Sequence, residues 1–201
     1  MDEPLKKEIS IYSFIRAELG GLFLPTDRLC FVAIPQGGGK GAKKCVAEHY
    51  FGMRNELLKS ENLSLLRRRN NSGFSLYFSI CPLRSGATRR RSEDVADICP
   101  AVWADFDVPT PAMEAFLAGK SYADVPVPDL AVSTSAGRWQ FFWKKPNMPT
   151  ADAIKEVREI AKKTGADIAV ADPARVLRLP GFQNRKPGRY GWDCRAYKVQ
   201  N

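Results

Sequence analysis

The residues CPAVWADFDVPTP, 99–111, are the most informative stretch of this chain for its fold. The apolar run AVWA leads into two aspartates, Asp105 and Asp107, and a proline-rich segment follows. Side chains at positions i and i+2 of a strand project from the same face, roughly 6.6–7 Å apart at their bases. We therefore expect a strand over residues 101–107 that presents both carboxylates on one face and turns Phe106 toward the core.

The residues after this strand predict a regular order of elements. Thr110 and Pro111 suit the N-cap and first position of a short helix, and Gly119 ends it. Polarity and turn signals then give a helix at 111–118, strands at 130–134 and 139–144 joined by a hairpin, a helix at 151–163 and a strand at 175–179. Strand, helix, strand, strand, helix, strand is the order of a ferredoxin-like or RNA-recognition-motif-like (RRM-like) sheet.

The residues before the strand predict a second module. Apolar spacing and alternation indicate a helix at 5–19, a strand at 29–35, a helix at 43–59 and a strand at 74–80, followed by a polar and basic connection. We therefore expect one α+β domain, 1–201, in which an N-terminal α/β module (1–97) packs on an RRM-like antiparallel-sheet module (98–201). The active site is expected in the cleft between the two modules.

Composition points to a polyanionic partner. The 201 residues carry 31 Lys and Arg against 22 Asp and Glu, a formal net charge of +9. Basic residues cluster at 67–69, at 89–91 and along NRKPGRYGWDCRAYK, residues 184–198. Cations that neutralise phosphates gain free energy from counterion release, which favours a nucleic acid or nucleotides as the partner.

The sequence lacks the patterns of membrane, secreted and zinc-binding proteins. No apolar run approaches the ~18 residues of a membrane span, and the charged N-terminus lacks a signal-peptide core, so no membrane is expected. We expect a cytoplasmic protein of a bacterial, archaeal or phage-infected cell. Five scattered cysteines without a CxxC pair, and one histidine, indicate reduced thiols and no zinc site.

Two carboxylates one residue apart suit a divalent cation. Two anions held together repel each other unless a cation neutralises them. Mg²⁺ commonly takes one or two protein carboxylates together with substrate phosphates, and a pair of such ions supports phosphoryl and nucleotidyl transfer. A solvated or helix-capping pair of aspartates is the simpler interpretation, and it explains Asp107 more easily than Asp105.

Two later segments offer groups that bind phosphate. STSAGRWQFFW (133–143) places small hydroxyl residues and backbone N–H groups at a hairpin turn, and DPARVLRLPGFQNRKPG (172–188) joins Asp172 to a basic loop. QGGGKG (36–41) is not a P-loop, because Ile34 occupies the first glycine position and Gly41 follows the lysine.

In this order, VWADFD, STSAGRWQFFW and DPARVLRLPGFQNRKPG resemble the three catalytic motifs of the archaeo-eukaryotic primase superfamily, specifically its RepB-like plasmid and phage primase-polymerases. The resemblance covers about residues 70–190, and its third segment is the most specific. It implies a DNA primase and polymerase that makes primers on a single-stranded DNA template and extends them from NTPs and dNTPs. A replicative helicase, separate or fused, is a further implied partner.

The resemblance also assigns roles to residues. It implies two Mg²⁺ or Mn²⁺ ions on the catalytic residues Asp105, Asp107 and Asp172. It places the nucleotide at Ser133, Ser135, Gly137, Arg138, Gln140, Arg178, Asn184, Arg185 and Lys186. Template contacts are expected from Arg89, Arg90, Arg91, Arg189, Tyr190 and Trp192.

One position departs from the superfamily pattern. Much of the superfamily carries a histidine in the second motif where this chain has Gln140. A neutral amide donates a hydrogen bond but cannot become cationic, so neutralisation of the triphosphate would fall to the neighbouring arginines and Lys186.

Two other classes fit parts of the pattern. A haloacid-dehalogenase-like phosphohydrolase also has a strand that ends in DxD, but Pro109 stands where its threonine or valine belongs and its later acid pair is missing. A non-catalytic RRM-like nucleic-acid-binding module would suit the charge. Its characteristic aromatic and basic motifs are not evident, and three convergent acids would repel phosphate without a metal.

Overall fold

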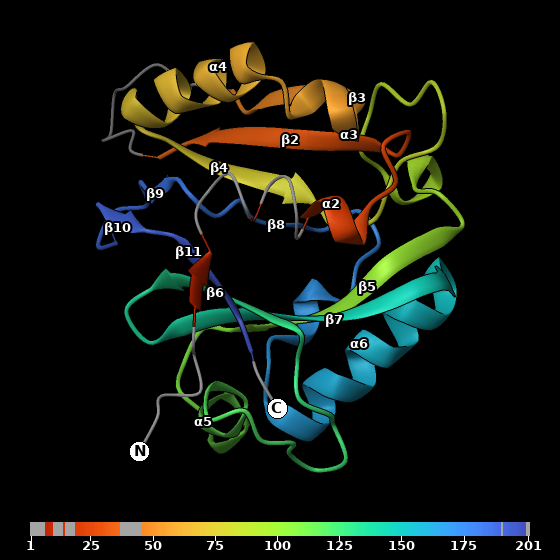
Figure 1. Cartoon of the computed structure of the whole chain (residues 1–201), viewed down its shortest axis with the longest axis vertical. Coiled ribbons are helices and arrows are strands. Elements are labelled where there is room, and N and C mark those ends of the chain that lie inside the picture. The colour runs from red at the N-terminus through yellow and green to blue at the C-terminus, as the bar shows by residue number, and fades with distance from the viewer. Residues whose placement is uncertain (1–6, 10–13, 15–18, 37–45, 190, 200–201) are drawn as a thin grey trace.

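Two antiparallel sheets face each other in the computed structural model, which describes residues 7–9, 14, 19–36, 46–189 and 191–199 (Figure 1). The large sheet has the order β1-β11-β6-β7-β5. Its strands are β1 (Lys7–Ile9), β11 (Arg195–Lys198), β6 (Leu130–Ser135), β7 (Arg138–Pro149) and β5 (Ile98–Phe106). The small sheet has the order β3-β2-β4-β8 and consists of β3 (Glu48–Met53), β2 (Arg28–Pro35), β4 (Phe74–Ser79) and β8 (Val176–Arg178).

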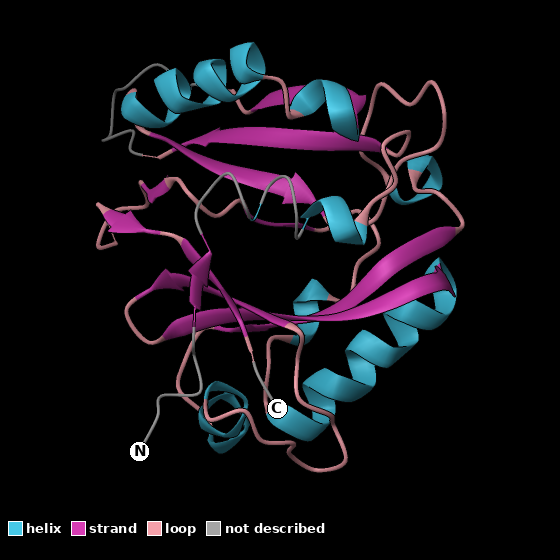
Figure 2. Ribbon diagram, in the orientation of Figure 1, coloured by secondary structure: helices cyan, strands magenta, loops and turns pink. Residues whose placement is uncertain are grey.

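The longer helices lie on the outer sides of the two sheets (Figure 2). α4 (Ser60–Asn71) covers the small sheet, while α5 (Pro111–Leu117) and α6 (Thr150–Thr164) cover the large sheet. Short helical pieces complete the fold: α2 (Leu19–Leu22), α3 (Arg54–Leu57) and the 3-10 turns η2 (Ser92–Asp94) and η3 (Ile168–Val170). The hairpin β9 (Gln183–Asn184) and β10 (Trp192–Asp193) forms a separate two-stranded ribbon.

This mixed α/β architecture with antiparallel sheets confirms the predicted fold class, and most elements after residue 74 lie close to their predicted positions. The strand that carries the aspartates spans Ile98–Phe106, and the helix after it begins at Pro111. Thr110 Oγ1 accepts a hydrogen bond from Met113 N at 3.1 Å, as expected of an N-cap.

Two helix predictions in the N-terminal part are wrong. Residues 48–53 form β3 rather than the middle of a helix, because they pair with β2 along its length, and only 54–57 are helical. Residues 7–9 form β1, which pairs with β11, rather than the first turn of a helix over 5–19. The rest of the first helix prediction falls largely outside the described residues, as do residues 43–45 of the second. Apolar spacing cannot reveal a strand whose partner lies elsewhere in the chain.

The sheets do not follow the predicted module boundary near residue 97. β8, expected as the fourth strand of the RRM-like sheet, pairs instead with β4 of the small sheet. β1, from the other end of the chain, joins the large sheet through β11. Each sheet therefore contains strands from both sides of the boundary.

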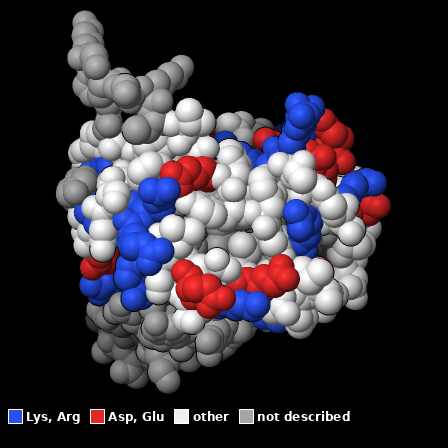
Figure 3. Space-filling view, turned by 90° about the horizontal axis from the view of Figure 1, so that it is seen from above, with Lys and Arg blue, Asp and Glu red and all other residues white. Residues whose placement is uncertain are grey.

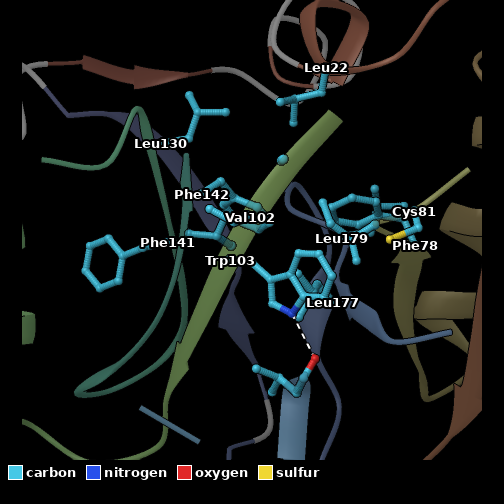
Figure 4. Packing of buried hydrophobic residues seen from close by; sticks show 14 of the residues in the cluster. Leu22, Phe78, Cys81, Val102, Trp103, Leu130, Phe141, Phe142, Leu177 and Leu179 are labelled. Carbon is cyan, nitrogen blue, oxygen red and sulfur yellow. Dashed lines mark hydrogen bonds between the residues drawn. The ribbon is translucent and has the colours of Figure 1, made fainter. Parts of the chain in front are cut away.

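The core lies between the sheets and is organised around Trp103 of β5 (Figure 4). This fully buried indole donates from Nε1 to Val170 O at 3.0 Å and points toward Leu177 of β8. Phe78 of β4 and Phe142 of β7 meet across the gap with ring centroids 6.4 Å apart. These contacts join the two sheets into one apolar core.

Strand alternation gives the large sheet two distinct faces. β5 and β7 are in register at Asp105–Gln140 and Phe106–Trp139, so these pairs alternate between the faces. Phe106 packs on Phe116 of α5, which marks the helix face. Trp103 and Asp105 lie on the opposite face, toward the small sheet, which we call the cleft face. Among the described residues, no helix is both long and apolar enough to cross a membrane.

Candidate active site

Asp105 stands at the end of β5 on the cleft face, half-buried beside Gln140 of the neighbouring strand. Gln140 Nε2 donates to Asp105 Oδ2 at 3.3 Å. On its other side the same amide accepts a hydrogen bond at Oε1 from the backbone N–H of Arg178 at 3.0 Å. Gln140 therefore links an acidic strand of the large sheet to a basic strand of the small sheet.

The surroundings of Asp105 disfavour its charged form. Burial raises the pKa of its carboxyl from 3.8 to about 6. The hydrogen bond from Gln140 lowers this pKa, the charges of Asp107 and Asp167 raise it, and Arg175 lowers it. A bound cation would relieve this electrostatic cost directly.

Asp107 follows β5 and is exposed, and two arginines approach it. Arg138, at the start of β7, forms an ion pair with Asp107 Oδ1. Arg189 Nη2 lies 3.8 Å from the same oxygen. Both arginines come from turns that the predicted site included, the 135–138 hairpin and the 184–189 loop.

Sequence reasoning missed a third acid, Asp167. Its backbone N–H donates to Asp105 O at 2.9 Å, so residue 167 lies directly against the end of β5. Its carboxylate accepts from Ala169 N at 2.9 Å and lies 4.0 Å from Arg175 Nη2. The ferredoxin-like order of elements could have predicted this position. In that order, the segment after the second helix returns beside the first strand, which here is β5.

Asp172, the third acid that the sequence suggested, occupies a turn before β8. It is exposed, and its Oδ1 accepts a hydrogen bond from Ala174 N at 2.9 Å. The structure therefore brings Asp105, Asp107 and Asp167 to the end of β5 and gives Asp172 a local capping role.

The residues at the end of β5 fit a hard divalent cation. In the part of the chain that the structure describes, no three His, Cys, Asp or Glu side chains already form a metal-binding group. Two carboxylates, one of them with a raised pKa, are nevertheless the donor set that Mg²⁺ uses together with substrate phosphates. Asp105 and Asp107 would hold the ion, and Asp167 is the nearest additional acid.

The small sheet carries a buried arginine on β8, the strand whose backbone Gln140 contacts. Arg178 of β8 is 6% exposed, and its guanidinium lies 4.4 Å from the centre of the Tyr77 ring. Its Nη1 is buried without a hydrogen-bond partner among the described residues. A buried guanidinium nitrogen without a partner is costly, which makes Arg178 a strong candidate to bind an anion.

The loop after β8 is held in place by its own side chains. Asn184 is fully buried, and its Nδ2 donates to Thr134 O at 2.8 Å while its Oδ1 accepts from Lys186 N at 3.1 Å. Arg185 N donates to Ser75 Oγ at 3.0 Å. Asn184 therefore fixes the loop rather than standing free for a ligand, and it leaves Lys186 exposed.

The hairpin residues divide between two places. Ser135 Oγ is buried without a partner among the described residues, and Gly137 takes φ +66° in the turn beside Arg138. Ser133 instead lies on the helix face, in register with Trp139, and accepts a hydrogen bond from Trp192 Nε1 at 3.1 Å. Ser135 is thus near Arg138, whereas Ser133 lies on the face opposite to Asp105.

The predicted template residues are spread over the surface. Arg90 donates to Ala174 O, and Arg91 pairs with Glu93 at 3.4 Å, so both have structural partners, while Arg89 is exposed. Trp192 is 39% exposed, and Tyr190 lies outside the described residues. Figure 3, which looks down on the α4 side, shows basic side chains with acidic ones beside them, so positive charge is not confined to one patch there.

Comparison with solved structures identifies the class of fold as that of primase-polymerases. The AEP domain of the cyanophage S-2L primase-polymerase superposes with a TM-score of 0.66 at 16% identity, covering 92% of this chain and 89% of that one. The catalytic domain of primase RepB′ in complex with initiator DNA gives 0.59 at 21% identity, covering 94% and 81%. Primase RepB′ in a second structure gives 0.60 at 20% identity, covering 95% of this chain and 56% of that one. Likenesses at this level of identity establish the fold.

The sequence itself establishes the family. The profile of the RepB DNA-primase N-terminal domain matches residues 57–200, and the chain belongs to this family. Among curated proteins, no sequence matches it closely enough to count as a relative. Family membership supports a primase role and a nucleotidyltransferase type of enzyme.

Proposed function

We propose that this protein is a primase-polymerase that joins nucleotides on a single-stranded DNA template with the help of two Mg²⁺ or Mn²⁺ ions. The observation that carries the proposal is the bridge through Gln140, which joins the Asp105 carboxylate to the backbone N–H of the buried Arg178. One side chain thus joins an acid suited to a metal ion to the strand that carries a buried arginine suited to a phosphate chain.

The residues take complementary roles in this reaction. Asp105 and Asp107 hold the divalent ions, which when bound supply the positive charge that stabilises the reacting and departing phosphate oxygens. Arg178 binds the triphosphate through its unpartnered nitrogen, and Lys186 adds charge from the exposed loop. Gln140 positions the Asp105 carboxylate relative to β8, because its single amide contacts both Asp105 and the backbone of that strand.

Arg138 and Arg189 have a second role at the same site. Both neutralise Asp107: Arg138 forms an ion pair with it, and Arg189 Nη2 lies 3.8 Å from its Oδ1. A divalent cation at Asp107 would compete with both guanidinium groups and release them toward the incoming phosphates. Incoming triphosphate and metal would then bind cooperatively.

The direct test is template-dependent synthesis by Asp105→Asn and Asp107→Asn variants. Primer extension with dNTPs, and primer formation with NTPs, are measured on single-stranded DNA with Mn²⁺ or Mg²⁺. We expect each variant to lose at least about 100-fold in rate, since removal of a group that stabilises transition-state charge typically has an effect of this size. The matched control is Asp152→Asn, an exposed acid at the start of α6, which should keep the wild-type rate. Template-dependent synthesis that survives in Asp105→Asn would overturn the proposal.

A second test decides between the two candidate third acids. Asp167 contacts the end of β5, whereas Asp172 caps a turn, so we expect Asp167→Asn to weaken metal-dependent synthesis far more than Asp172→Asn. The concentration of Mn²⁺ that gives half-maximal rate is measured for each. A larger shift for Asp172→Asn would show that Asp172 is the metal ligand.

A further inference from the structure

A polar cavity lies on the helix face of the large sheet, opposite to the face that carries Asp105. It has a volume of about 470 Å³ and is lined by Ser133, Gly191, Trp192, Asp193, Arg195 and Tyr197. α5 and α6 cover β5 and β7 on this face, and the cavity lies over the part formed by β6 and β11. The cavity is not part of the cleft that holds Asp105.

Register explains why these side chains gather there. β11 pairs with β6 at Arg195–Ser133 and Tyr197–Ala131, so Arg195 and Tyr197 share the helix face with Ser133. Tyr197 packs against Trp139 of β7, with ring centroids 5.7 Å apart. The ring of Tyr197 is thus fixed from one side and half-buried.

Trp192 forms the other aromatic wall and is also held in place. Its indole Nε1 donates to Ser133 Oγ at 3.1 Å, and its backbone N–H donates to Arg189 O at 3.3 Å. With 39% of its surface exposed, the ring is fixed in position but still open to a ligand. Such preorganised aromatic surfaces are the platforms on which bases of single strands stack.

A neighbouring cavity shares Trp192 with this one and is lined by the two arginines that contact Asp107. This space of about 300 Å³ is lined by Ser135, Ala136, Arg138, Gly188, Arg189 and Trp192. Arg138 and Arg189 of this space contact Asp107, and Trp192 lines both spaces. The sequence of groups from the carboxylates outward is therefore cationic first and aromatic second.

We call the 470 Å³ cavity, which is lined by Trp192 and Tyr197, the outer cavity. Its charged groups suit a nucleobase rather than a triphosphate. Asp193 would repel a highly charged phosphate chain, and its Oδ2 lies 3.8 Å from Arg195 Nη2. A nucleobase offers both donors and acceptors to this pair, and the single phosphates of a strand fit the basic groups around it.

We infer that the outer cavity, with Trp192 and Tyr197 as its walls, is a base-stacking subsite for single-stranded DNA that passes around the 135–138 hairpin to the acid pair. This inference deepens the proposed function, on which it rests, by naming where the strand lies. The strand crosses from the cleft face to the helix face along Arg138, Arg189 and Trp192.

The test measures strand binding without catalysis. A fluorescently labelled dT12 is titrated in EDTA, with no nucleotide, against the wild type and the Trp192→Leu and Tyr197→Leu variants. We expect each variant to weaken binding by about 5- to 150-fold, the range for loss of one base–aromatic stack. Tyr50→Leu, which alters a half-buried tyrosine on the edge strand β3 of the small sheet, is the matched control and should bind as the wild type does.

Two further arms separate stacking from other causes. A strand with abasic sites in place of bases should bind more weakly to the wild type, and this loss should shrink in Trp192→Leu. Free dTMP should compete only at concentrations far above those of the strand. The inference would be overturned if removal of the bases weakened strand binding equally in the wild type and in Trp192→Leu. It would also be overturned if free dTMP competed as strongly as dT12.

Failure of this inference is distinguishable from failure of the proposed function. If Trp192→Leu and Tyr197→Leu bind dT12 normally while the wild type extends primers, only the subsite is refuted. If strand binding depends on both rings but the wild type extends no primer, the subsite stands and the polymerising function fails. Circular dichroism of each variant confirms that loss of binding is not loss of fold.

Discussion

At the scale of single residues, the candidate site contains two ionisable side chains whose burial is energetically unfavourable. Asp105 is a carboxyl with a pKa raised to about 6, and Arg178 is a buried guanidinium with a nitrogen that lacks a partner among the described residues. Both arrangements carry an electrostatic cost. Under the proposed function, a metal ion beside Asp105 and a phosphate beside Arg178 would relieve it.

The pKa of Asp105 gives a prediction about stability. Its folded-state pKa lies above the ordinary 3.8, so the charged form destabilises the folded protein above about pH 6, and this cost disappears as the pH falls toward 4. A tenfold change in an acid dissociation constant corresponds to about 1.4 kcal/mol, so Asp105→Asn should raise the free energy of unfolding at pH 8 by at most about 3 kcal/mol. At pH 4 the variant and the wild type should be equally stable.

Urea denaturation in EDTA at the two pH values measures this effect. Asp152→Asn, in which the exposed acid has no such burial, serves as the control and should show no pH-dependent gain. If Asp105→Asn is no more stable than the wild type at pH 8, the charged form of Asp105 does not destabilise the folded protein.

At the scale of elements, the segment from α6 to β8 positions the third acid. α6 ends at Gly165, which takes φ +75° and donates from its N–H to Ala161 O at 2.9 Å. This left-handed turn directs the chain to Asp167, and the hydrogen bond from Trp103 to Val170 O then fixes η3 against β5. One glycine and one indole thus place Asp167 beside Asp105.

Gly165→Ala tests this arrangement. A residue with a Cβ costs about 1–2 kcal/mol in the left-handed conformation, so the variant should lose about that much stability in urea denaturation. Gly165→Asn should lose less, because asparagine tolerates this conformation at helix C-termini. Equal losses in the two variants would indicate that the backbone conformation at residue 165 is not the cause.

At the scale of the whole molecule, the two sheets exchange strands from opposite ends of the chain. β8 completes the small sheet, although it follows α6 of the large sheet, and β1 extends the large sheet from the N-terminus. The core between the sheets is shared, as the Phe78–Phe142 contact shows. We therefore regard the chain as one cooperative unit.

This organisation predicts a single unfolding transition. In differential scanning calorimetry of residues 1–201, the calorimetric and van 't Hoff enthalpies should agree. A fragment of residues 98–201 would leave β8 without its partner β4 and should show no cooperative transition. Cooperative melting of this fragment would mean that the second module folds alone.

Local pattern and motifs predict several parts of this protein. AVWADFD predicted the strand and its two carboxylates, Thr110-Pro111 predicted the start of α5, and the three motifs predicted the family that the profile match confirms. Strand pairing, and the identity of the acid that accompanies Asp105, emerged from the three-dimensional arrangement alone. β3 and β1 are strands because β2 and β11 offer them hydrogen bonds, and Asp167 rather than Asp172 meets Asp105 because the chain turns at Gly165. Such pairings join residues distant in the chain, so no local pattern records them.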